Sequence, residues 1–229
     1  MNKASESDAH GPTNRSAHAR KQTAAVAAIW IVATVAIGVS LATARTGSAA
    51  TDLGSVIGQS VPAMTLATVG AILVVRLPGH VIGWILAGGG LAIAVTEMAL
   101  GVADYGLNAH PGSVPGAIWF AWLGQLMWAP EVACLFILLP LFYPSGRLPS
   151  GRWRVVLLIA GALVVIGGVS GAFVQWAPPP YPVGNPLARS GLVGALVSFL
   201  NYVVATVLVL AGGVLAAASL VVRYRRAAS

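Results

Sequence analysis

Hydrophobic residues along the chain gather into six long runs, separated by short polar segments rich in Gly, Pro, Ser and Arg. A helix rises 1.5 Å per residue, so about 20 residues cross the ~30 Å hydrocarbon core of a bilayer, and each run reaches that length. The pattern predicts an all-α fold, a polytopic membrane helix bundle with about six transmembrane helices; five or seven are the neighbouring alternatives. We expect the helices at about residues 23–44, 55–75, 80–103, 116–143, 153–174 and 192–222.

The two ends of the chain lack such runs. Residues 1–22 are polar and of mixed charge, which predicts a disordered cytoplasmic tail, and residues 223–229 are predicted to form a basic cytoplasmic end. A basic start followed by an apolar run is also typical of a signal peptide. The run at 23–44 exceeds the apolar core of a signal, which is about 7–15 residues, so an uncleaved membrane anchor is favoured.

Composition supports the membrane assignment and excludes other classes. The chain is 57% hydrophobic and only 8% charged, whereas soluble domains average about 25% charged residues. A net charge of +7 would suit a nucleic-acid partner. The charges, however, lie between apolar runs and at the ends of the chain and form no basic patch, so no nucleic-acid partner is expected. The single cysteine, Cys134, lies in an apolar run and offers neither an intrachain disulfide nor a thiolate metal cluster.

Lys and Arg are distributed unevenly between the two sides that six spans would create. With the N-terminus inside, eleven fall on the inner side and only Arg45 and Arg189 on the outer side. This bias predicts that both termini are cytoplasmic in a multi-pass protein of the plasma membrane. The outer segment 175–191 is rich in proline and is expected to form an extended cap. The inner residues are Lys3, Arg15, Arg20, Lys21, Arg76, Arg147, Arg152, Arg154, Arg223, Arg225 and Arg226.

A few polar residues interrupt the spans. Glu97 and Asp104 are seven residues apart on the third span and share a helix face, while Gln125 and Glu131 lie on the fourth. A bare carboxylate at the bilayer centre costs at least ~2.5 kcal/mol, so each should be protonated, paired or turned into the bundle. Two interpretations stay open: a proton-sensitive or ligand-sensing site, or neutral carboxyl groups that hydrogen-bond two helices together.

No catalytic, cofactor or metal-binding motif is present. The triple glycine at 88–90 lies inside a span without a following Lys-Ser or Lys-Thr pair, and neither an HExxH nor a Gly-x-Ser-x-Gly pattern occurs. The sequence therefore predicts no enzyme activity for this chain and no cofactor.

Two basic turns carry a resemblance to a known family. The segment Arg76-Leu-Pro-Gly-His-Val-Ile-Gly-Trp-Ile-Leu86 resembles the Arg-x-Pro-x-Asn-Pro-Ile-Gly-Trp-Leu-Leu turn of certain actinobacterial sensor histidine kinases. The segment Leu141-Phe-Tyr-Pro-Ser-Gly-Arg-Leu-Pro-Ser-Gly-Arg-Trp-Arg154 is similar to their Leu-Phe-Pro-x-Gly-Arg-Leu-Pro-Ser-x-Arg-Trp-Arg turn. Arg76, Arg147, Arg152 and Arg154 form this cytoplasmic loop motif. The similarity covers roughly residues 55–226 and departs from the pattern where His80-Val81 replace Asn-Pro.

The resemblance implies a sensor or input module without its kinase core, because no phosphoacceptor or ATP-binding region follows Ser229. Its expected partners are the lipid bilayer and either a second copy in a homodimer or a separate kinase. The alternative is a small proton- or cation-coupled transporter or channel that uses Glu97 and Glu131.

Overall fold

The computed structural model describes residues 12–46, 53–176 and 183–227, and within these residues every regular element is a helix. Six helices are long and apolar enough to cross a membrane. The predicted all-α bundle of six spanning helices is therefore confirmed.

Each of the first three spans is a single long helix, and the third is followed by one short π-helical turn. They are α1 (Pro12–Ala44), α2 (Leu53–Arg76), α3 (Val81–Asp104) and η1 (Tyr105–Ala109). Helix α1 starts well before the predicted span, so the described part of the predicted disordered tail, residues 12–22, is helical; residues 1–11 lie outside the described part. Proline is tolerated at the first helical position, where its missing N–H would be unpaired in any case, and Pro12 occupies that position.

The last three spans are less regular. The fourth consists of α4 (Ala117–Val132), the π segment η2 (Ala133–Leu138) and α5 (Leu139–Phe142), and the fifth of η3 (Gly151–Trp153) and α6 (Arg154–Phe173). The sixth consists of α7 (Gly191–Ser198), η4 (Phe199–Val204) and α8 (Ala205–Ala227). Helix α8 continues through most of residues 223–229, the predicted basic C-terminal segment. The proline-rich cap predicted at 175–191 falls largely on residues 177–182, which lie outside the described residues.

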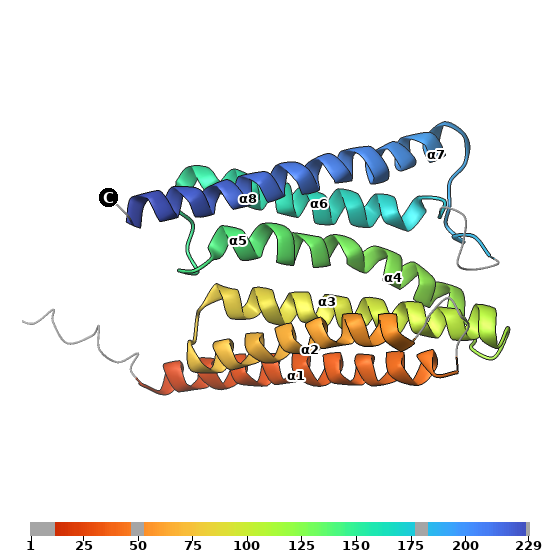
Figure 1. Cartoon of the computed structure of the whole chain (residues 1–229), viewed down its shortest axis with the longest axis horizontal. Coiled ribbons are helices and arrows are strands. Elements are labelled where there is room, and N and C mark those ends of the chain that lie inside the picture. The colour runs from red at the N-terminus through yellow and green to blue at the C-terminus, as the bar shows by residue number, and fades with distance from the viewer. Residues whose placement is uncertain (1–11, 47–52, 177–182, 228–229) are drawn as a thin grey trace, which may run out of the picture.

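The long helices run side by side, with α1, α2 and α3 on one side of α4–α5 and with α6 and α8 on the other (Figure 1). The start of α1, the α2–α3 turn, the α5–α6 turn and the end of α8 all lie at one end of the bundle. We call this the basic end, because it carries Arg20, Lys21, Arg76, Arg147, Arg152, Arg154, Arg223 and Arg225. The end of α1 and the start of α7 lie at the opposite end of the bundle (Figure 1). Arg45 directly follows α1, and Arg189 lies just before α7.

Helices α2 and α3 approach so closely that glycine is required at their contact. A Cβ atom at Gly90 would lie 2.6 Å from both the carbonyl oxygen of Ala63 and the backbone nitrogen of Ala67. Gly70 faces the backbone of Ala87 and Gly83 in the same way. Since lipid tails are as apolar as the side chains, membrane helices associate largely through close packing at small residues.

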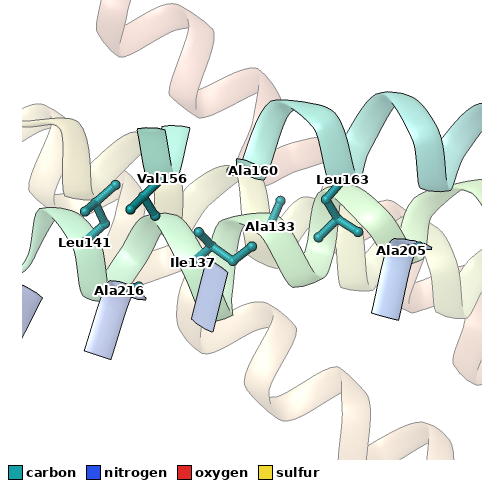
Figure 2. Packing of buried hydrophobic residues seen from close by; sticks show 8 residues of the cluster. All are labelled: Ala133, Ile137, Leu141, Val156, Ala160, Leu163, Ala205 and Ala216. Atoms are coloured by element: carbon teal, nitrogen blue, oxygen red, sulfur yellow. The ribbon is translucent and has the colours of Figure 1, made fainter. Parts of the chain in front are cut away.

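A second core joins the fourth span to α6 and α8. Figure 2 shows Leu141 and Val156 lying against each other beside Ile137, all three fully buried. Gly212 of α8 lies against the side chain of Ile137. The same cluster includes Ala133, Ala160, Leu163, Ala205 and Ala216.

We expect Gly90→Ala to destabilise the bundle by about 1–3 kcal/mol, because the added methyl group meets backbone that cannot turn aside. The measurement is thermal unfolding of the purified protein in detergent, followed by circular dichroism. Gly88→Ala is the matched control, since a Cβ there meets nothing within 4 Å and alanine favours the helix. Equal melting temperatures for the two variants would contradict the close contact.

Candidate functional site

Two of the four predicted intramembrane residues lie on neighbouring helices that pack against each other. Glu97 of α3 and Glu131 of α4 are both half-buried, and their carboxyl groups are close enough to interact electrostatically. They lie along the α3–α4 contact between two packing points, where Leu100 meets Gly124 and Leu135 meets Gly89. The charged group that acts on Glu97 across this contact is therefore another carboxyl group.

Glu131 lies at a break in helical regularity. It follows Pro130, which has no backbone N–H, and the chain turns π-helical at Ala133 for six residues. Short π segments inside α-helices occur frequently at functional sites. The fourth span thus carries a carboxyl group and an irregular backbone at the same depth.

The structure gives Asp104 and Gln125 contacts of their own. Asp104 lies seven residues after Glu97, about 10 Å further along the helix axis. Its carboxylate is fully buried and accepts a hydrogen bond from Asn108 Nδ2 at 2.8 Å. Gln125 lies where α4 meets α6, with its backbone oxygen next to Gly171.

Helix α6 accepts hydrogen bonds from two elements that pack against it, η4 and α4. Asn201 of η4 is buried and donates from Nδ2 to Ser170 Oγ at 3.2 Å and to the Gly167 carbonyl at 3.4 Å. Trp122 of α4 donates from Nε1 to the Ala172 carbonyl at 3.0 Å. Asn201 and the Trp122 indole therefore both bind α6.

At the basic end, one arginine joins the last helix to the α5–α6 turn. Arg223 of α8 donates from Nη1 to Ser145 Oγ at 2.7 Å and from Nη2 to the Leu141 carbonyl at 2.9 Å and to the Arg147 carbonyl. We call this set of hydrogen bonds the Arg223 clamp. The planar guanidinium can hold several acceptors at fixed angles, which an ammonium group cannot do as well. The sequence predicted that Arg223 belongs to a basic C-terminal segment, but it did not predict this contact.

The two turns that resemble sensor kinases also meet each other. The imidazole of His80 packs against Gly146, where a Cβ would lie 3.1 Å from His80 Nε2. Gly146 has a φ of +69°, a left-handed conformation that glycine adopts without strain. His80 is thus one point at which the first turn contacts the second. Arg152 and Arg154 are exposed.

The described residues hold no group of three or more His, Cys, Asp or Glu side chains that could bind a metal ion. The chain matches no protein-family model, and neither a curated protein nor a solved structure shows significant similarity to it.

Replacing Arg223 with Ala should release the α5–α6 turn, because Ser145 and the carbonyl groups of Leu141 and Arg147 lose their common donor. We expect faster hydrogen–deuterium exchange at the amides of residues 145–150 in detergent-purified protein. Arg225→Ala is the control, as Arg225 is exposed near the end of the same helix. Unchanged exchange in Arg223→Ala would show that the clamp does not order the turn.

Proposed function

We propose that this multi-pass integral membrane protein is an input module that passes a change within the bundle to a histidine kinase at the basic end. The single observation that carries the proposal is the Arg223 clamp, which ties the last helix to the turn after the fourth span. We infer that the basic end faces the cytoplasm of a cell with this protein in its plasma membrane, since Lys and Arg gather there.

Such a signal would pass along the fourth span. Glu131 and Leu141 belong to the same α4–η2–α5 path, ten residues or about 15 Å apart. Protonation of Glu131, or a ligand beside it, would change its interaction with Glu97 and hence the packing of α4 on α3. The far end of that path offers the Leu141 carbonyl to Arg223, so a shift of α4–α5 alters the hydrogen bonds that hold α8. A stimulus acts by binding one of two packings more tightly than the other.

The α2–α3 turn and the α5–α6 turn suggest that the partner is a kinase. Their motifs resemble those of sensor kinases, and they pack together at the end of the bundle where α8 emerges. Helix α8 continues to Ala227, so its last turns extend a rigid rod that a second protein or domain can engage.

A second candidate function is proton- or cation-coupled transport. The observation in its favour is the Glu97–Glu131 pair inside a membrane bundle, because intramembrane carboxyl groups mark proton and ion paths in transporters.

The kinase proposal predicts that the last turns of α8 are needed for partner association. Protein isolated from its native membranes should carry a co-purifying kinase that incorporates phosphate from ATP as acid-labile phosphohistidine. Ending the chain after Val222 should abolish that label, while ending it after Arg226 should keep it. The proposal fails if the label is absent from the full chain or survives the cut after Val222.

The transport proposal predicts flux in purified proteoliposomes under a pH or sodium gradient. Glu131→Gln keeps the side-chain size but removes the ionisable group, and we expect it to reduce flux at least tenfold. Asp104→Asn is the comparison, since Asp104 lies away from the pair and is hydrogen-bonded to Asn108. Flux that is equal in wild type, Glu131→Gln and protein-free vesicles would exclude transport.

A further inference from the structure

Two hollows at the basic end share one residue, Arg76. The first is polar, has a volume of about 410 Å³ and lies between the two kinase-like turns. Its lining includes Arg76, His80, Ser145 and Arg147 and no acidic residue. Its lining therefore combines two arginines with no carboxylate.

The second hollow is an apolar groove of about 540 Å³ between α1 and α2. Ala27, Trp30, Ile31, Ile72 and Val75 line it, and most of these side chains face outward from the bundle, where a bilayer would lie. The groove extends from Arg76 to Thr68, eight residues or about 12 Å along α2. That depth stays within one leaflet, whose share of the ~30 Å hydrocarbon core is about 15 Å.

The polar atoms at the deep end of the groove satisfy each other. Trp30 Nε1 donates to Thr68 Oγ1 at 2.9 Å. An occupant of the groove therefore needs no hydrogen-bonding group at that depth, as a hydrocarbon chain does not. The only charged residue in the lining is Arg76, at the mouth of the groove.

We propose that these two hollows form one binding site for an anionic glycerophospholipid of the leaflet at the basic end. The headgroup phosphate lies in the polar hollow against Arg76 and Arg147, and one acyl chain lies in the α1–α2 groove. Guanidinium groups pair with phosphate oxygens through two parallel hydrogen bonds, and basic pockets between membrane helices bind acidic headgroups. The apolar groove that opens at Arg76 distinguishes a lipid from a free phosphate ion, which would use the polar hollow alone. This site does not depend on the kinase or transport proposal.

The test is native mass spectrometry of the delipidated full-length protein, titrated with phosphatidylglycerol or phosphatidylcholine. We expect one phosphatidylglycerol to bind at least tenfold more tightly than phosphatidylcholine. Arg76→Gln and Arg147→Gln should each weaken it by about fivefold, as expected for one basic residue near an anionic lipid. Arg152→Gln is the charge-matched control, because Arg152 lies in the same turn outside the lining of the hollow.

The groove is tested with a neighbouring pair of substitutions. Ala27→Phe fills the groove and should weaken phosphatidylglycerol at least fivefold, whereas Ala28→Phe, exposed on α1 but outside the lining, should not. Equal melting temperatures confirm that both variants are folded. Equal binding of the two lipids, or equal loss in Arg152→Gln, would overturn the proposal. Displacement by 10 mM inorganic phosphate, with Ala27→Phe binding normally, would overturn it in favour of a free-anion site.

Discussion

The bundle depends on the close approach of α2 and α3. In water, burial of apolar surface would hold two such helices together, but a bilayer offers no comparable gain, so dispersion contacts between closely spaced backbones take its place. Gly70 and Gly90 allow that spacing from both helices, since a Cβ at either position would strike backbone of the other. Helix α1 packs against both α2 and α3, and the fourth span lies mainly against α3.

The fourth span connects the two sides of the molecule. One side of α4–η2–α5 packs against α3 at the contact that contains Glu97 and Glu131. The other side packs against α6 and α8 through the second core, which includes Ile137 (Figure 2). Its Pro130 and π segment make it less regular than α2 or α3. The candidate chemistry and an irregular backbone therefore lie in the same element, which also supplies the Leu141 carbonyl to Arg223.

Much of this architecture was predictable from local sequence. The six apolar runs define six helices because a spanning backbone must satisfy its own hydrogen bonds. Most observed ends lie within two residues of the expected ones; the exceptions are the start of α1 and the ends of the third and sixth spans, which continue to Ala109 and Ala227. The proximity of Glu97 and Glu131 depends on how α3 and α4 are rotated about their axes, and their residue spacing carries no information about that. The Arg223 contacts join residues 76 to 82 positions apart, and the His80–Gly146 contact depends on two turns folding toward each other. Such long-range contacts leave no periodic pattern in one sequence.

The placement of the glycine contacts has a consequence for biosynthesis. Chains are made from the N-terminus onward, so α1, α2 and α3 leave the ribosome before the central span exists. Helices α1 and α2 contact mainly each other and α3, which allows these three helices to assemble while the rest is still being translated. The fourth span, which includes the π segment η2, then finds α3 already in place, and α6 and α8 gain their packing partner only when the fourth span has formed. In this protein the order of translation matches the order in which each helix finds its neighbours.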